Sequence, residues 1–250
     1  MGFSWQVFDS RQQLGEAAAA RAAELIRSAV AQRGRARVIV ATGNSQLAFI
    51  DALTAMQDIP WEATEIFHMD EYAGMPDTHP ASFRKWIRER VVDKVRPAAA
   101  HYINGDAPEL KAECERYTLL LNAAPVDLAF VGIGENGHIA FNDPHVANFR
   151  DPLTIKVVDL DEACRKQQVG EGHFPSFESV PREALTLTCP ALMRAEHLVC
   201  CVPDARKANA VKCSVEGPIG EACPGSLLRT HPDATLYLDR QSASLLARSA

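Results

Sequence analysis

The chain has 250 residues, of which 47% are hydrophobic and 23% charged, and its formal net charge is −6. This balance is typical of a globular protein with one sizeable core and not of a disordered chain. The negative charge argues against nonspecific binding to nucleic acid or to anionic membranes, because both need clustered Lys and Arg. No apolar stretch approaches the roughly 20 residues of a membrane span, and no signal peptide is visible.

Helical and strand-like stretches alternate along the sequence. Ala-rich residues 12–32 predict a helix, and apolar residues 36–41 predict a buried strand. We further predict helices over 46–56, 82–92, 109–122, 205–215 and 240–247, and strands over 64–69, 127–132, 197–202 and 235–238. This order predicts an α/β fold, Rossmann-like, with a mainly parallel sheet and helices on both faces. Residues 144–190 break the rhythm, but no linker divides the chain, so we interpret 1–250 as a single domain.

The 7 cysteines are odd in number and form no C-x-x-C pair. Cys200 and Cys201 lie in an apolar run that is typical of a strand. We interpret the cysteines as reduced and mostly buried, which together with the absent signal peptide predicts a cytoplasmic protein.

Polar segments, two of them with glycine, follow three of the predicted strands, at residues 42–45, 70–71 and 133–143. Ligands of such sheets bind beyond the carboxyl ends of the strands. The three segments therefore predict one site.

The segment Thr42, Gly43, Asn44 and Ser45 stands between a strand and a helix. Backbone N–H groups at a helix start favour an anion, and two hydroxyls add donors. A plain turn with Ser45 as helix cap is an equally good interpretation. Lys207, beside Arg206 at a later helix start, could reach a phosphate, or the two could form a solvated basic pair.

Two segments carry groups that can move protons. Asp70 and Glu71 are adjacent carboxylates, suited to acid–base work unless they form a solvated acidic turn. In the Gly-rich stretch 132–144, His138 titrates near neutrality and Asp143 could orient it. A core histidine and a metal ligand are the alternatives, although no H-x-H or H-x-x-x-H spacing supports metal.

Together these segments resemble the glucosamine-6-phosphate deaminase/isomerase family over roughly residues 8–246. The motifs that carry the resemblance are M-D-E-Y at 69–72, G-H-I-A-F-N at 137–142, R-K-A-N-A-V at 206–211 and E-G at 216–217. The 6-phosphogluconolactonases share the fold, but they usually carry Arg after D-E and a G-H-T-A-S-L-type run. Tyr72 and the run 139–142 favour the deaminase branch.

The resemblance implies an aldose–ketose isomerisation with loss of ammonia, without metal or cofactor. It implies that Asp70 moves a proton between C2 and C1, and that His138 opens the sugar ring. Asn136 and Asp143 stand where the family places two carboxylates that hold the histidine. Substrate contacts are implied for residues 42–45, Glu71, Gly137 and Lys207, and the protein is expected to form homo-oligomers.

The sequence departs from the family pattern at three places. Asn136 replaces an Asp, so His138 should feel less negative charge, and Asp143 replaces a longer Glu. Gly172 and His173 stand where a phosphate-binding Arg usually precedes the Phe. Two other functions therefore stay open: lactone hydrolysis or isomerisation of another phosphosugar, and phosphosugar sensing without turnover.

Overall fold

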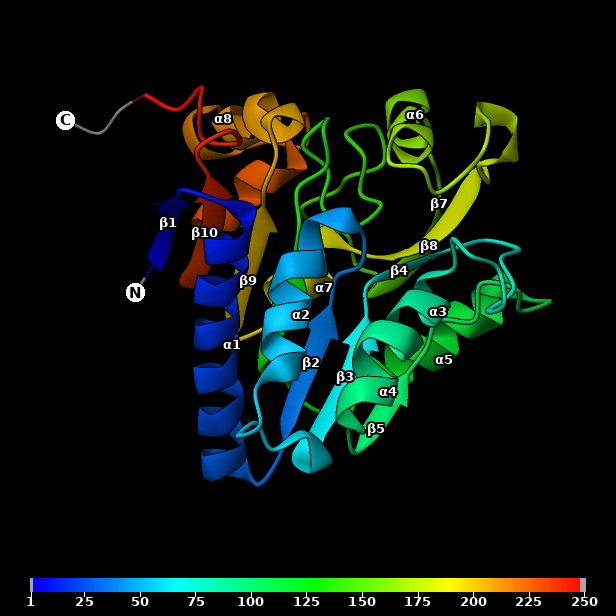
Figure 1. Ribbon diagram of the computed structural model, residues 1–250. Coiled ribbons are helices and arrows are strands. Elements are labelled where there is room, and N and C mark those ends of the chain that lie inside the picture. The colour runs from blue at the N-terminus through cyan, green and yellow to red at the C-terminus, as the bar shows by residue number, and fades with distance from the viewer. Residues whose placement is uncertain (1, 248–250) are drawn as a thin grey trace.

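A computed structural model describes residues 2–247, and its centre is a seven-stranded sheet in which every strand pair is parallel (Figure 1). From edge to edge the strands are β1 (Gly2–Phe8), β10 (Asp233–Asp239), β9 (His197–Val202), β6 (Leu128–Val131), β2 (Ala36–Val40), β3 (Thr64–His68) and β5 (Ala99–His101). Strands buried on both faces need continuous apolar runs, and β2 and β6 are buried at every position. The predicted α/β fold with a mainly parallel sheet is confirmed.

Helices cover both faces of this sheet. The α-helices within residues 2–247 are α1 (Arg11–Arg33), α2 (Leu47–Ala55), α3 (Phe83–Ile87), α4 (Asp93–Val95), α5 (Leu110–Asn122), α6 (Glu162–Gly170), α7 (Cys189–Met193) and α8 (Ala208–Glu216), and all but α6 belong to these two layers. Alternate strand residues point to opposite faces. Val38 therefore packs in a core with α1 and α2, whereas Ile39 packs in a second core with α5, α7 and α8.

A second, antiparallel sheet lies beside the first and comes partly from the stretch 144–190. Its strands, in order, are β4 (Asp70–Tyr72), β8 (Glu183–Leu187) and β7 (Ile155–Asp159). It packs with α6 around a third apolar cluster that includes Tyr72, Phe141 and Phe174. In Figure 1 this sheet and α6 stand at the upper right, across from α8.

Most predicted elements lie within a few residues of the observed ones, but two differ. The predicted helix over 82–92 is α3 continued by a wide π-helical turn at Arg88–Val92. The predicted helix over 240–247 is wrong, because these residues form turns. Asp239 and Ser242 exchange hydrogen bonds between side chain and backbone there, and such local bonds compete with helix formation.

The strand order reverses at β2, which pairs with β3 on one side and with β6 on the other. Chain segments that leave β2 and β6 diverge at this point and leave a crevice at the carboxyl ends of the strands. The loops after β2 and β6 rise there between α8 and α6 (Figure 1).

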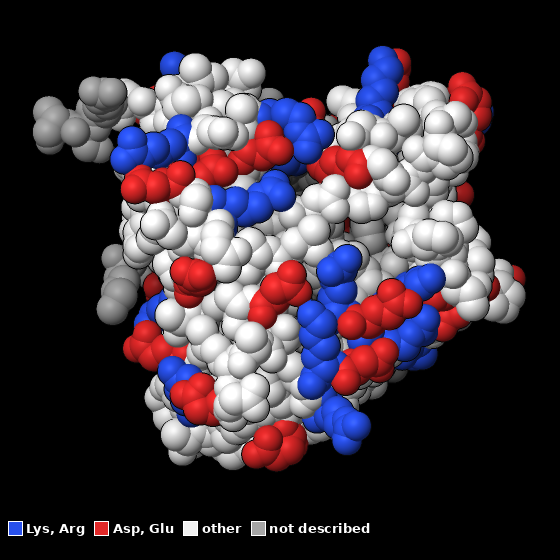
Figure 2. Space-filling model, viewed as in Figure 1, with Lys and Arg blue, Asp and Glu red and all other residues white. Residues whose placement is uncertain are grey.

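No helix within residues 2–247 is long and apolar enough to cross a membrane. On the face shown in Figure 2, acidic and basic side chains are interspersed, without a broad patch of one sign.

The contact between α1 and α2 predicts that Gly15→Ala destabilises the protein. A Cβ atom at Gly15 would lie 2.6 Å from the backbone carbon of Ala48 and 2.7 Å from the nitrogen of Phe49. Overpacking of this kind costs about 1–3 kcal/mol. Gly170→Ala is the matched control, since Gly170 is also helical and has open space around it. Urea unfolding should give a lower free energy for Gly15→Ala alone; equal stability of both variants would contradict the contact.

Candidate active site

A small pocket of about 80 Å³ opens at the carboxyl ends of β2 and β6, where ligands of such sheets bind. It is lined by Ala41, Thr42, Gly43, Asn44, Ser45, Met69, Asp70, Phe83, Gly132, Ile133, Gly134, His138, Ala140, Phe141, Gln167, Gln168, Glu171, His173 and Lys207. The three polar segments that follow predicted strands thus meet in one place, together with Lys207.

Asp70 is a buried carboxylate with little to compensate its charge. Only 6% of the residue is exposed, and its Oδ1 atom has no hydrogen-bond partner among the described residues. Burial, and then the charge of Glu71, raise the pKa of Asp70 well above its usual value. A carboxylate with a raised pKa holds a proton strongly once it has taken one, which suits a general base.

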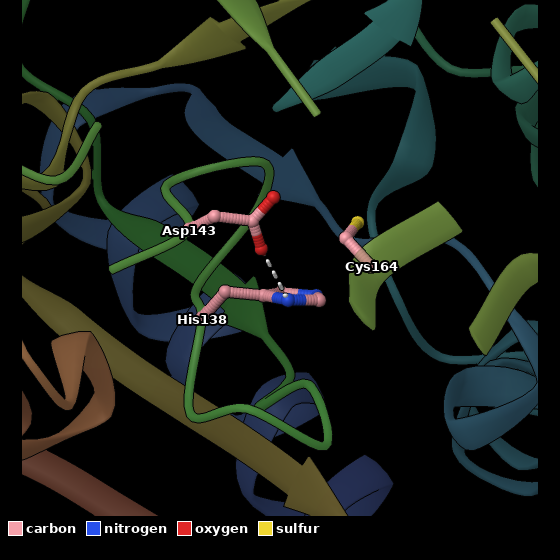
Figure 3. Close-up of side chains that lie close together, drawn as sticks. All are labelled: His138, Asp143 and Cys164. Atoms are coloured by element: carbon pink, nitrogen blue, oxygen red, sulfur yellow. Dashed lines mark ion pairs between the residues drawn. The ribbon is translucent and has the colours of Figure 1, made fainter. Parts of the chain in front are cut away.

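His138 and Asp143 form the second chemical group of the site (Figure 3). The Nδ1 atom of His138 lies 3.0 Å from an oxygen of the fully buried Asp143, in a contact that is close but bent. A carboxylate only accepts, so Asp143 favours the proton on Nδ1 and leaves Nε2 without one. Burial opposes the charge of Asp143, but the nearby His138 and hydrogen bonds from Asn136 and the backbone of Asp161 lower its pKa overall.

Gly134 sits directly against the imidazole of His138. A Cβ atom at Gly134 would lie 2.1–2.4 Å from three ring atoms, so a side chain there is incompatible with this ring position. Gly137 has φ 86°, a conformation that favours glycine, and its N–H donates to the carbonyl of Gly134. The glycines of this loop therefore set where the histidine lies.

Asn136, Gly137 and Asp143 do not line the pocket but lie behind His138. The Asn136 amide donates to Asp143 at 2.9 Å and to Asp161 at 3.2 Å, and its oxygen accepts the backbone N–H of His138 at 3.1 Å. These residues thus contact the histidine and the loop that carries it.

The opposite end of the pocket can receive an anion. Gly43, with φ 95°, turns the chain so that residues 42–45 line the pocket just before α2. Lys207 is 5% exposed, and burial lowers its pKa even though nearby carboxylates oppose this shift. Its Nζ atom lies 3.8 Å from Glu171. An ammonium at a helix start is a good phosphate contact.

Glu71, for which a substrate contact is predicted, is not among the residues that line the pocket. Successive strand residues point to opposite sides, so Glu71 faces away from the side to which Asp70 points. Its carboxylate accepts the Ser82 hydroxyl at 2.8 Å and the backbone N–H of Arg84 at 2.9 Å, at the start of α3. Glu71 fixes the position of α3 and contributes to the field at Asp70.

Four pocket residues of the α6 region escaped the sequence analysis as site residues: Gln167, Gln168, Glu171 and His173. The Glu171 carboxylate accepts from Gln167 at 2.8 Å and lies 3.4 Å from Nε2 of His173. Burial raises the pKa of Glu171, but His173, Lys207 and Gln167 outweigh it and lower the pKa overall. His173 stands near the place where the resemblance expects a phosphate-binding arginine. This was the only feature of the sequence that pointed to a site residue in this region.

Cys164 of α6 lies beside the His138–Asp143 pair (Figure 3). Burial and the charges of Asp143 and Asp161 raise the pKa of its thiol, so the neutral form is favoured. His138, Asp143 and Cys164 are one group of side chains close enough to share a metal ion, and Asp143, His145 and Asp161 are another. In both groups Asp143 is already engaged by hydrogen bonds from Asn136 and from the backbone of Asp161.

Comparison with known proteins identifies the class. The model of the family of glucosamine-6-phosphate isomerases and 6-phosphogluconolactonases matches residues 9–237, so the chain belongs to this family. The solved structure of a 6-phosphogluconolactonase from Thermotoga maritima has a TM-score of 0.77 at 18% identity, covering 95% of this chain and 99% of that one, and it supports the fold alone.

The more similar relatives are deaminases. Glucosamine-6-phosphate deaminase from Pseudarthrobacter chlorophenolicus is 35% identical over 90% of this chain and 87% of its own length. The enzyme of the same name from Bacillus cytotoxicus is 33% identical over 97% and 89%. The solved structure of a monomeric glucosamine-6-phosphate deaminase has a TM-score of 0.89 at 30% identity and covers 97% of this chain and 99% of that one.

The buried charge of Asp70 predicts that Asp70→Asn stabilises the protein at neutral pH. Because its pKa is raised in the folded state, the folded protein binds more protons than the unfolded chain above about pH 4, and stability falls as pH rises. Removing the charge should raise the free energy of unfolding at pH 7 by about 1–3 kcal/mol. The gain should shrink toward pH 4.

Asp159→Asn serves as the control for that measurement, because Asp159 is exposed at the end of β7. Urea titrations at several pH values should separate the two variants at pH 7. An unchanged or lowered stability of Asp70→Asn at pH 7 would show that the Asp70 charge is compensated.

Proposed function

We propose that the protein converts glucosamine 6-phosphate and water into fructose 6-phosphate and ammonia. The observation that carries this proposal is that Asp70, His138 and Lys207 line one pocket although they come from distant parts of the chain. A base, a histidine and an anion contact are the groups that this reaction needs. The deaminases among the relatives support the same reaction.

The substrate phosphate would bind at residues 42–45 and Lys207. Hydroxyls, backbone N–H groups near the start of α2 and the buried ammonium would hold it. With the phosphate anchored there, the sugar would extend toward Asp70 and His138. Fixing the sugar in this way lowers the barrier by positioning.

Asp70 would act as the base that carries the proton from C2 to C1. It must be ionised to accept the C2 proton, and its burial makes it a stronger base than an exposed carboxylate. The enol formed between C1 and C2 then takes the proton back at C1. Water replaces nitrogen at C2, and ammonia leaves.

His138 would open the sugar ring by proton transfer to the ring oxygen. Asp143 holds the imidazole ring at Nδ1, so Nε2 is left to exchange a proton. Asp143 would stabilise the positive charge that forms on the imidazole during this transfer.

The proposal extends to the setting of the reaction. The substrate is a small phosphosugar, and the 7 cysteines are unpaired, which suits the cytoplasm. Assembly into homo-oligomers stays a prediction for this chain.

Ammonia release from glucosamine 6-phosphate by the purified protein, with chelator present, tests the reaction directly. Asp70→Asn and His138→Gln should each lower kcat by about 10²–10⁴-fold, because each removes a group that moves protons. Asp51→Asn is the control, since Asp51 pairs with Lys94 on the surface of α2. Unchanged rates in the first two variants would overturn the assigned roles.

Absence of ammonia release by the wild-type protein would redirect the proposal. Hydrolysis of 6-phosphogluconolactone would then favour the lactonase branch, and tight phosphosugar binding without turnover would favour a sensor.

Lys207→Met should raise KM for glucosamine 6-phosphate by roughly 10–100-fold, because a charge-assisted contact contributes about 1.5–3 kcal/mol. Lys212→Met is the matched control, since Lys212 is exposed on α8, which begins directly after Lys207. Steady-state kinetics of both variants give the comparison. A KM that is equally affected, or unaffected, in the two variants would place the phosphate elsewhere in the pocket.

A further inference from the structure

The amide of Asn136 has only one orientation that satisfies its neighbours. Its amino group faces the carboxylates of Asp143 and Asp161, which only accept, and its oxygen faces the backbone N–H of His138. Reversing the amide would set oxygen against both carboxylates. Asn136 is therefore fixed by two carboxylates at once and in turn fixes the backbone at His138.

Asp161 divides its two oxygens between two tasks. Oδ1 accepts the backbone N–H of Cys164 at 2.6 Å and caps the start of α6, while Oδ2 accepts from Asn136. The backbone N–H of Asp161 also donates to Oδ2 of Asp143 at 3.3 Å. Asp161 thus contacts both groups that hold His138, from a segment outside the histidine loop.

We propose that Asp161 is a positioning residue for His138, acting through the Asn136 amide. Its carboxylate keeps the amino group of Asn136 turned toward Asp143, and it adds a second negative charge near the histidine. The neutral amide at 136 is matched to this arrangement, because a carboxylate there would bring three anions together without a donor between them. The tests of this role that measure catalysis rest on the proposed function.

Asp161→Asn tests the role without removing the helix cap, because Asn caps helices as well as Asp does. The new amide can still accept from Cys164, but its amino group then meets the amino group of Asn136. This conflict should release Asn136 from Asp143. We expect kcat for ammonia release to fall about 10–100-fold, the usual scale for residues that orient a catalytic group, with KM little changed. The acid limb of the pH profile of kcat/KM should also shift.

The matched control is Asp159→Asn, two residues earlier, which makes the same change in charge at an exposed carboxylate. It should keep the wild-type kcat and pH profile. If capping were the only task of Asp161, Asp161→Asn would behave like this control, and the proposal would be overturned.

A double-mutant cycle adds a test by rescue. Asn136→Asp alone should lower kcat, because it gathers three carboxylates. Combined with Asp161→Asn it exchanges amide and carboxylate, so that a donor again stands between the two positions. The double variant should recover about tenfold over the weaker single variant; losses that simply multiply would show that Asp161 and Asn136 act independently.

NMR spectroscopy tests the positioning role of Asp161 without measuring activity. The Nδ1–H proton of His138, assigned by its loss in His138→Gln, should be visible by NMR in the wild-type protein and in Asp159→Asn. It should shift or broaden in Asp161→Asn. An unchanged signal would overturn the proposal, whereas a wild-type protein that shows the expected signal changes but releases no ammonia would overturn only the proposed function.

Discussion

The parallel pairing of β2 with β3 on one side and β6 on the other is the constraint on which the site depends. Parallel strands end at the same edge, so the loops that follow β2 and β6 must emerge beside each other. Residues 42–45 and the histidine loop meet there, and β4 brings Asp70 to the same edge. The pocket is therefore a consequence of strand order, and its chemistry comes from the loops that this order gathers.

Two buried carboxylates of the pocket region have opposite electrostatic surroundings. Asp70 lacks a hydrogen-bond partner at Oδ1, and its pKa is raised; Asp143 accepts from Asn136 and from the backbone of Asp161 and lies beside His138, and its pKa is lowered. The same functional group thus suits two tasks, because an uncompensated carboxylate favours taking a proton and a compensated one stays charged beside His138. Residues that do not line the pocket, among them Glu71 and Asn136, contribute to this difference in pKa.

The α6 region joins both ends of the site. Its first residues contact the groups behind His138 through Asp161, and its last residues bring Glu171 to Lys207. Near Lys207, the proposed phosphate site has the carboxylate of Glu171 and the imidazole of His173 where the family pattern has one arginine. The departures from the family pattern at 136 and 143 lie in the histidine loop, and the one at 173 lies just after α6. Contacts between this loop and the α6 region connect the three positions.

The sequence by itself determined the alternation of helices and strands, because apolar periodicity is local, and it singled out Asp70, His138 and Lys207 through the polar segments at strand ends. It did not predict the small sheet of β4, β8 and β7, since β4 pairs with a strand more than a hundred residues further along the chain and these short runs carry no local signal. The turns at 240–247 escaped it because side chain–backbone bonds at Asp239 outcompete helix propensity. Only the tertiary structure decided that Glu71 points away from the pocket, that Glu171 and His173 line it, and that Asp161 contacts Asn136 and Asp143, because those contacts join segments whose proximity exists only once the sheet has formed.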